Sequence, residues 1–116
     1  MDYQALFLTA EGRINRKTYW IGAVILFVVN IVLTLLGLAA REHISILYWL
    51  FTLVSIALIY PGLCIAIKRF HDRDKSGWWV LIALIPLIGW IWYLIEVGFL
   101  PGTNGPNQYG LDSRAV

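Results

Sequence analysis

Apolar residues fill three long stretches of this chain, and charged residues are almost excluded from them. The stretches cover residues 19–40, 44–67 and 78–100, and Glu96 is their only charged residue. A helix rises about 1.5 Å per residue, so each stretch is long enough to cross the roughly 30 Å hydrocarbon core of a bilayer. The pattern predicts an all-α, polytopic membrane protein with three transmembrane helices, forming one domain over residues 1–116.

Prolines within the second and third stretches qualify this prediction. Pro61 is expected to bend its helix rather than end it, because neighbouring helices can satisfy the freed carbonyl group. Pro86 and Gly89 interrupt the third stretch and leave two interpretations open. We favour a single crossing, which places the tail 101–116 on the opposite side from the preceding loop. The alternative is a turn at residues 86–89 within the membrane, which returns the tail to the same side.

The two ends of the chain differ in character. In the N-terminal segment 1–18, Tyr3, Leu6, Phe7 and Ala10 recur at helical spacing with little charge, which predicts a short helix lying on the membrane surface. The tail is rich in residues that favour turns, so we expect a compact turn packed against the helix ends. The first stretch is longer than the usual signal-peptide core of roughly 7–15 residues, so we expect it to be a retained helix.

The distribution of basic residues predicts the orientation. Charged residues make up only 14% of the chain, against roughly a quarter in ordinary soluble domains. Of the nine lysines and arginines, seven lie before the first stretch or between the second and third, whereas Arg41 and Arg114 lie elsewhere. Cytoplasmic segments carry such an excess of Lys and Arg. The N-terminus and the loop 68–77 are therefore predicted to face the cytoplasm.

Two basic segments are predicted to meet at the cytoplasmic face and form the main candidate binding site. Its members are Arg13, Arg16, Lys17, Lys68, Arg69, His71, Asp72, Arg73, Lys75 and Trp78. In the simpler interpretation these charges set the orientation, Asp72 and Asp74 neutralise neighbouring arginines, and Ser76 or Asp74 caps the next helix. In the alternative they bind anionic lipid headgroups or an acidic partner protein, because an arginine can bind phosphate oxygens through two parallel hydrogen bonds.

Two polar residues inside the apolar stretches lead to further hypotheses. Asn30 is expected to form a hydrogen bond to another helix, and Glu96 is expected to reach the headgroups. The alternative is an oligomeric transporter or channel in which both residues line a path. Small residues recur at helical spacing along the first two stretches, which favours self-association into a homo-oligomer.

The chain carries few signs of catalysis. It has no Gly-rich phosphate loop, no nucleophile with a paired base and no zinc-type Cys/His spacing, so we predict no metal ion and no cofactor. A net charge of +2 and a single cysteine exclude a basic nucleic-acid-binding tail and a disulfide-rich scaffold. A lipid-modifying enzyme that uses His71 and Asp72 is the alternative to a non-enzymatic role.

Short motifs occur in a fixed order along the whole chain. They are Gly12-Arg13-x-x-Arg16-x-x-Tyr19-Trp20, Lys68-Arg69-Phe70-His71-Asp72, Lys75-Ser76-Gly77-Trp78-Trp79, Pro86 with Gly89, and Gly102-x-x-Gly105-x-Asn107-x-Tyr109-Gly110. This order resembles the YhaH-like family of small bacterial inner-membrane proteins, also called domain-of-unknown-function family 805. Phe70 stands where that family usually has leucine, and Gln108 where a basic residue is common.

The resemblance implies a small helical domain in the bacterial inner (plasma) membrane, with no established reaction or ligand. It marks a few positions as the first to test: Arg13, Arg16, Arg69, His71, Asp72 and Trp78. A tail motif that acts together with the cytoplasmic motifs would favour the turn at residues 86–89. We therefore predict a non-enzymatic, multi-pass inner-membrane protein that binds anionic headgroups or a partner protein at its cytoplasmic face.

Overall fold

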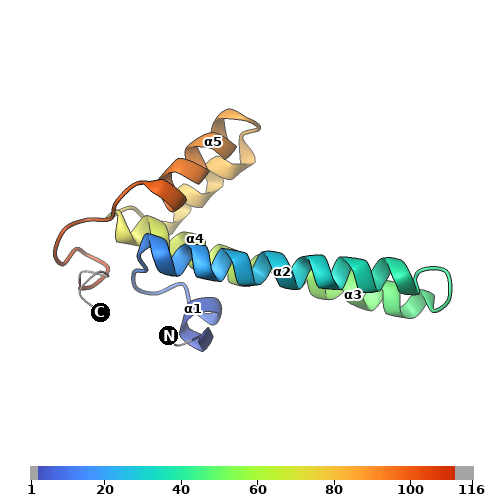
Figure 1. Ribbon diagram of the computed structural model, residues 1–116. Helices are drawn as coiled ribbons and strands as arrows, with labels where there is room; N and C mark the ends of the chain where they lie inside the picture. Colours follow the sequence, from blue (N-terminus) through green and yellow to red (C-terminus); the bar gives the residue numbers. More distant parts are fainter. Residues whose placement is uncertain (1–2, 112–116) are drawn as a thin grey trace.

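The computed structural model describes residues 3–111, and every regular element in this range is a helix (Figure 1). The elements are α1 (Tyr3–Leu8), α2 (Arg16–Ala40), α3 (Ser45–Ala57), α4 (Ile59–Asp72), the 3-10 helix η1 (Gly77–Leu84), α5 (Ile88–Leu94) and the π-helix η2 (Ile95–Phe99). The predicted all-α class is confirmed.

Two helices are long and apolar enough to cross a membrane, Arg16–Ala40 and Ser45–Asp72. They lie side by side and run in opposite directions, joined by a short turn at one end of the molecule (Figure 1). The side chain of Asn15 accepts a hydrogen bond from the backbone N–H of Thr18 and so caps α2. Because of this cap, α2 begins before the apolar stretch 19–40 and includes two basic residues, Arg16 and Lys17.

The second long helix is interrupted at one residue, where α3 meets α4. Leu58 separates the two parts and keeps helical backbone angles (φ −67°, ψ −12°). Pro61 lacks the N–H that would bind the carbonyl of Ala57, and its ring crowds that carbonyl. The expectation that Pro61 does not end its helix is confirmed, since α4 continues to Asp72. Residues 68–72 then extend α4 beyond the apolar stretch 44–67, so its charged residues lie past that stretch.

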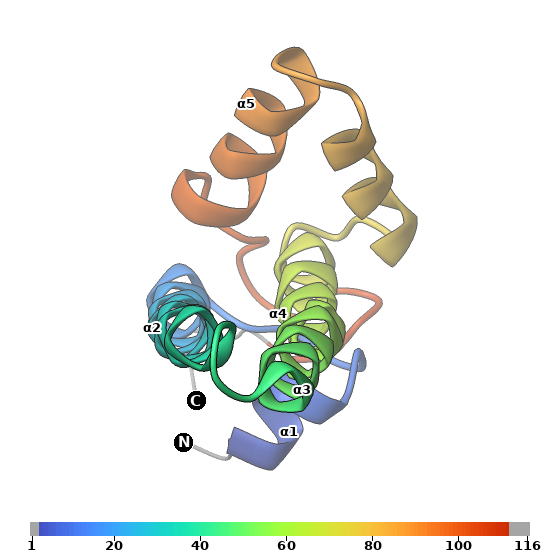
Figure 2. The ribbon, with the colours of Figure 1, turned by 90° about the vertical axis from the view of Figure 1, so that its right-hand side faces the viewer.

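The third apolar stretch does not form the one continuous helix that the favoured single crossing requires. Residues 77–99 fold into a hairpin in which η1 runs outward and α5 with η2 runs back beside it (Figure 2). The rings of Trp79 and Trp92, one on each arm, lie 6.0 Å apart between centroids. A straight helix is prevented by Pro86, which lacks an N–H, and by the positive φ of Leu87 (61°). The prediction of one continuous helix over residues 78–100 is wrong.

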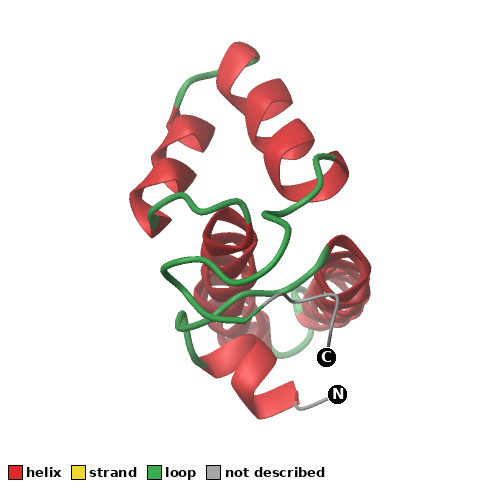
Figure 3. Cartoon of the chain, turned by 90° about the vertical axis from the view of Figure 1, so that its left-hand side faces the viewer, coloured by secondary structure: helices red, strands yellow, loops and turns green. Residues whose placement is uncertain are grey.

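Because the hairpin reverses direction, the tail returns to the end of the molecule where the chain begins. Figure 3 shows the loops before α2 and after η2 crossing the ends of α2 and α4. The compact turn expected in the tail is present. The backbone groups of Asn107 and Gly110 exchange hydrogen bonds of 2.9 and 3.2 Å, and the Asn107 side chain accepts one from the N–H of Tyr109.

Buried side chains concentrate at this same end, which we call the polar end (residues 3–20, 64–76 and 93–111). Its apolar core consists of Leu6, Tyr19, Ile65, Phe70 and Val97. We call residues 28–57 the far end. There α3 has no buried residue, and Gly37 is the one buried position of α2. The fold is therefore densely packed at one end and open to its surroundings at the other.

Candidate functional site

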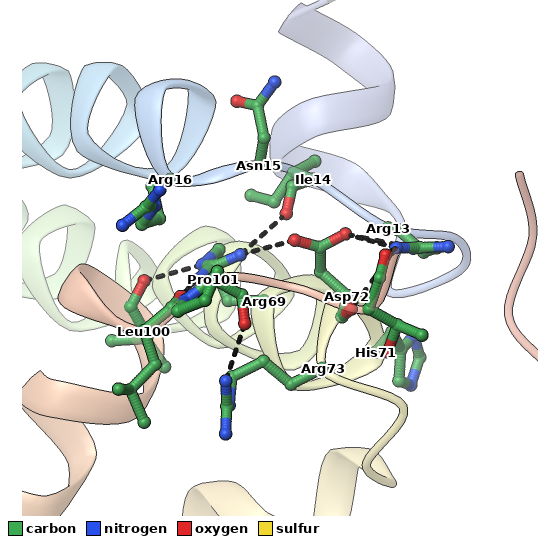
Figure 4. A network of polar contacts seen from close by, with 12 residues as sticks. Arg13, Ile14, Asn15, Arg16, Arg69, His71, Asp72, Arg73, Leu100 and Pro101 are labelled. Atoms are coloured by element: carbon green, nitrogen blue, oxygen red, sulfur yellow. Dashed lines mark hydrogen bonds and ion pairs between the residues drawn. The ribbon is translucent and has the colours of Figure 1, made fainter. Parts of the chain in front are cut away.

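A buried ion cluster lies at the centre of the polar end. We call it the Asp72 cluster; Arg13 comes from the loop before α2, and Arg69 and Asp72 lie on one face of α4 (Figure 4). The Asp72 carboxylate binds Arg13 at 2.9 Å through Oδ1 and Arg69 at 2.7 Å through Oδ2. All three side chains are at most 3% exposed. Charges taken out of water need such complete pairing, because an unpaired one costs several kcal/mol.

The other guanidinium N–H groups of the cluster bind backbone carbonyls from distant segments. Arg69 donates to the carbonyl oxygens of Val97 (2.6 Å), Leu100 (2.7 Å) and Ile14 (3.2 Å). Arg13 donates to those of Thr103 and Gly105 (2.8 Å each), and to those of Asp72 and Gly110. Within the described residues, no buried side-chain nitrogen or oxygen lacks a hydrogen-bond partner. The cluster thus holds the N-terminal loop, α4, the hairpin and the tail together.

The tail passes directly over the cluster. The N–H of Thr103 donates to the carbonyl of Asp72 at 2.7 Å. Gly102 lies so close to the Asp72 carboxylate that a Cβ at this position would overlap it. A glycine is therefore required here by close approach.

His71 contacts the tail at Asn107 and Tyr109. Its Nδ1 donates to the carbonyl of Gly12 at 2.9 Å, and its ring stacks on that of Tyr109 at 3.9 Å between centroids. The side chain of Asn107 donates to the carbonyl of His71 at 2.9 Å. Burial lowers the pKa of His71, and the contact with the Gly12 carbonyl opposes this effect only in part. The neutral imidazole is therefore the form that fits the folded protein.

A second ion cluster, the Glu96 cluster, closes the base of the hairpin. Glu96 accepts from Nε of Arg73 at 2.6 Å, from Nζ of Lys75 at 2.5 Å and from the indole N–H of Trp92 at 3.2 Å. Arg73 also donates to the carbonyl of Pro101. Glu96 is 4% exposed. Its charge is therefore matched by bases of the loop between α4 and η1, rather than directed toward the surroundings.

Three of the remaining candidate bases lie near the start of α2 or against α1. Lys68 is buried and donates to the carbonyls of Ala5 and Leu6 at the end of α1. Arg16 and Lys17 are exposed, and Arg16 donates a hydrogen bond to the carbonyl of Phe99 at 2.8 Å. A cavity of about 340 Å³, which we call the Arg16 cavity, lies beside them. It is lined by Asn15, Arg16, Lys17, Asp72, Pro101 and Gly102.

The structure thus divides the ten predicted site residues instead of joining them in one binding surface. The simpler interpretation of the charges is confirmed in two respects: Asp72 pairs with arginines, and Ser76 accepts a hydrogen bond from the N–H of Trp78 and so caps η1. Trp78 itself lies on the hairpin with 79% of its surface exposed, apart from the buried ion cluster.

The residue pairs of the other hypotheses are not brought together. Asn30 accepts a hydrogen bond from Thr34 of its own helix, in place of the expected contact with another helix. Gly98, two residues after Glu96, accepts a hydrogen bond from the indole of Trp20. Helical rise places Asn30 about 15 Å further along α2 than Trp20. His71 and Asp72 are each held by the contacts given above. Among residues 3–111, no group of three or more His, Cys, Asp or Glu side chains could hold a metal ion.

Sequence reasoning missed part of the cluster's partners. Tyr109, Asn107 and Gly102 belong to the tail motif, and their place in that motif was the available signal. The carbonyl groups that bind Arg13 and Arg69 gave no signal, because every residue carries a carbonyl.

Comparison with known proteins gives consistent results. The family described as "Protein of unknown function (DUF805)" matches residues 7–111. The inner membrane protein YhaI of Escherichia coli is 38% identical over 108 residues, covering 90% of this chain and 85% of the relative. The inner membrane protein YhaH of the same organism is 36% identical, covering 90% and 86%, and the uncharacterized protein YiiR is 31% identical, covering 100% and 93%. No solved structure matches the chain.

Proposed function

Because this chain belongs to the DUF805 family, whose relatives YhaI and YhaH are inner membrane proteins, we propose that it binds the phosphate group of an anionic phospholipid in the Arg16 cavity. In this proposal the N-terminus faces the cytoplasm and the polar end lies at the headgroups of the inner leaflet. The inner-membrane location follows from the relatives and from the two long apolar helices.

The observation that carries the proposal is the contrast among the basic residues. Arg13 and Arg69 each form an ion pair with Asp72, and Arg73 and Lys75 each form one with Glu96. Lys17 forms no hydrogen bond or ion pair among the described residues, and Arg16 binds one neutral carbonyl. These two side chains therefore carry charge that the fold leaves uncompensated.

The position of these charges suits a lipid headgroup. Arg16 and Lys17 come directly before the apolar stretch 19–40, so they lie at the depth of lipid phosphates if α2 crosses the membrane. The carboxylate of Asp72 also lines the cavity, but its charge is already matched by two arginines. The net charge presented to the cavity is positive, which favours an anionic ligand.

The test compares a double variant with a matched control. Purified protein carrying Arg16→Gln and Lys17→Gln is placed in nanodiscs that contain phosphatidylglycerol and phosphatidylcholine, and the retained lipids are measured by native mass spectrometry. Each basic residue near the surface contributes about 1 kcal/mol, so the affinity for phosphatidylglycerol should fall about 30-fold. Arg41→Gln removes one charge at the opposite end of α2 and should leave it unchanged.

Two results would contradict the proposal. One is unchanged retention of phosphatidylglycerol by the double variant, with the protein folded. The other is an equal loss in Arg41→Gln, which would indicate a general effect of charge and not a site. If these two bases bind an acidic partner protein instead of a lipid, the double variant will retain phosphatidylglycerol unchanged.

A further inference from the structure

The surface of the hairpin is apolar along its whole length. No charged residue lies between Lys75 and Glu96. The most exposed large side chains of this segment are apolar: Trp78 (79%), Leu84 (77%), Ile88 (72%) and Leu87 (67%). Two of them, Leu87 and Ile88, are at the tip, the part of the hairpin furthest from the rest of the molecule (Figure 2). A continuous exposed apolar surface marks a site that contacts a membrane or another protein.

The hairpin is too short to cross a bilayer. The eight residues of η1 extend about 16 Å at roughly 2.0 Å per residue. Residues 88–99 return over about 18 Å at the usual helical rise. One leaflet contributes about half of the roughly 30 Å hydrocarbon core. The hairpin is also inclined to α2 (Figure 1), so its tip would reach the middle of the bilayer at most.

The base of the hairpin carries the groups that belong at a headgroup region. Lys75 and Glu96 stand at its two ends and form an ion pair of 2.5 Å. Arg73 joins the same carboxylate and is 21% exposed, so this cluster has access to water. Intramembrane charges are costly, and these residues therefore place the base outside the hydrocarbon.

Several backbone N–H and carbonyl groups near the tip form hydrogen bonds with each other. This pairing lowers the cost of placing a turn in lipid. The N–H groups of Ile85, Ile88 and Ile91 donate to carbonyls of residues 82, 86 and 87. The indole N–H of Trp90 donates to the carbonyl of Ala83 at 2.9 Å, across the two arms. Gly89 allows this close packing, because a Cβ there would overlap the carbonyl of Ile82.

We propose that the hairpin inserts into a single leaflet, the one next to the polar end, and that acyl chains of this leaflet cover it. The tip lies near the middle of the bilayer and the Glu96 cluster lies at the headgroups. The tail is then on the same side as the N-terminal segment. α1 lies at this end as well, so the chain is widest in that leaflet and narrows to α2 and α3 in the other (Figure 1).

The first measurement concerns sidedness. Single cysteines at Glu11, Gln108 and Glu42 replace exposed residues and are labelled in sealed membrane vesicles with an impermeant maleimide. Cys64 is buried, and the parent protein gives the background labelling. Gln108→Cys should label from the same side as Glu11→Cys, and Glu42→Cys from the opposite side. Labelling of Gln108→Cys together with Glu42→Cys would show a full crossing and overturn the proposal.

The second measurement concerns depth. Nitroxide labels on Trp78→Cys, Leu84→Cys and Leu87→Cys are compared with one on Val29→Cys, near the middle of α2, using collisions with oxygen and with a water-soluble nickel complex. We expect the ratio of oxygen to nickel accessibility to rise toward Leu87 and to match that of Val29 there. A nickel-accessible Leu87 would place the hairpin on the membrane surface. A label at Leu87 that is immobilised and hidden from oxygen would show a second protein chain in place of lipid. Either result would overturn the proposal.

Discussion

The two ends of this molecule are stabilised by different means. At the polar end, Arg13, Arg69 and Asp72 are buried together and connect segments as far apart as the N-terminal loop and the tail. At the far end, α2 and α3 contact each other along exposed apolar surfaces, and no residue of α3 is buried within the chain. The far end has the length and composition of a membrane span, and its remaining apolar surfaces are left without a partner within the described residues.

This difference shows where the fold is specified. Apolar helices in lipid gain little by contacting each other, because lipid tails are as apolar as leucine. Buried ion pairs with directed hydrogen bonds allow few arrangements. The polar end should therefore be sensitive to changes that keep shape and alter charge, and the far end should not.

The largest effect is expected from Asp72→Asn. The substitution keeps the size of the side chain but leaves Arg13 and Arg69 buried without a counter-charge, which costs about 3–5 kcal/mol. The free energy of unfolding in detergent micelles, measured by chemical denaturation, should fall by this amount. Asp74→Asn is the matched control, because Asp74 is exposed and asparagine tolerates its positive φ of 61°. Equal stability of the two variants would contradict a structural role for the cluster.

The sequence predicted the helices better than their arrangement. Hydrophobicity identified α2 and the α3–α4 helix, because each coincides with a long apolar stretch of the sequence. It could not decide between a crossing and a hairpin, because both satisfy the same apolar pattern. The deciding contacts join Arg69 to the carbonyls of Val97 and Leu100, far apart in sequence. Such contacts leave no local pattern.

The candidate site shows the same limit. The basic residues were identified, but their division into paired and unpaired charges depends on which carboxylate each one meets. Asp72 was expected to pair with neighbouring arginines, and it does pair with Arg69, one turn away. Its second partner, Arg13, lies before α2 and could not be inferred from spacing.

A second, smaller contrast between the ends comes from two glycine substitutions. Gly102→Ala places a methyl group against the Asp72 carboxylate and must displace the tail. We expect a loss of about 1–3 kcal/mol, as for overpacking in a protein core. At Gly37 a Cβ would lie 3.6 Å from Cβ of Phe51, an ordinary contact. Gly37→Ala should therefore be neutral or stabilising by up to about 1 kcal/mol, because alanine favours helix. The free energies of unfolding of the two variants are measured side by side. A larger loss in Gly37→Ala than in Gly102→Ala would show that the far end is the more tightly packed one.

Glu96→Gln should loosen the base of the hairpin by about 1–2 kcal/mol, since two charged donors lose their partner while remaining partly in contact with water. Glu42→Gln, at an exposed position of the turn between α2 and α3, should change the stability little. The spacing of the two arms can be followed by disulfide cross-linking of Trp79→Cys with Trp92→Cys, with and without Glu96→Gln. An unchanged cross-linking rate and an unchanged stability would show that Glu96 does not hold the two arms.

The smallest effect is expected from pH, through His71. Burial lowers the pKa of this imidazole in the folded protein, so the unfolded chain takes up a proton more readily. Stability is therefore retained above the usual histidine pKa of about 6.5 and decreases as the pH falls below it. The loss should release the tail, because the ring contacts both the Gly12 carbonyl and Tyr109. Denaturation at pH 7.5 and 5.5 would measure it against His71→Gln, which keeps every other titrating group. If both proteins lose the same stability on acidification, the pH response arises elsewhere in the chain.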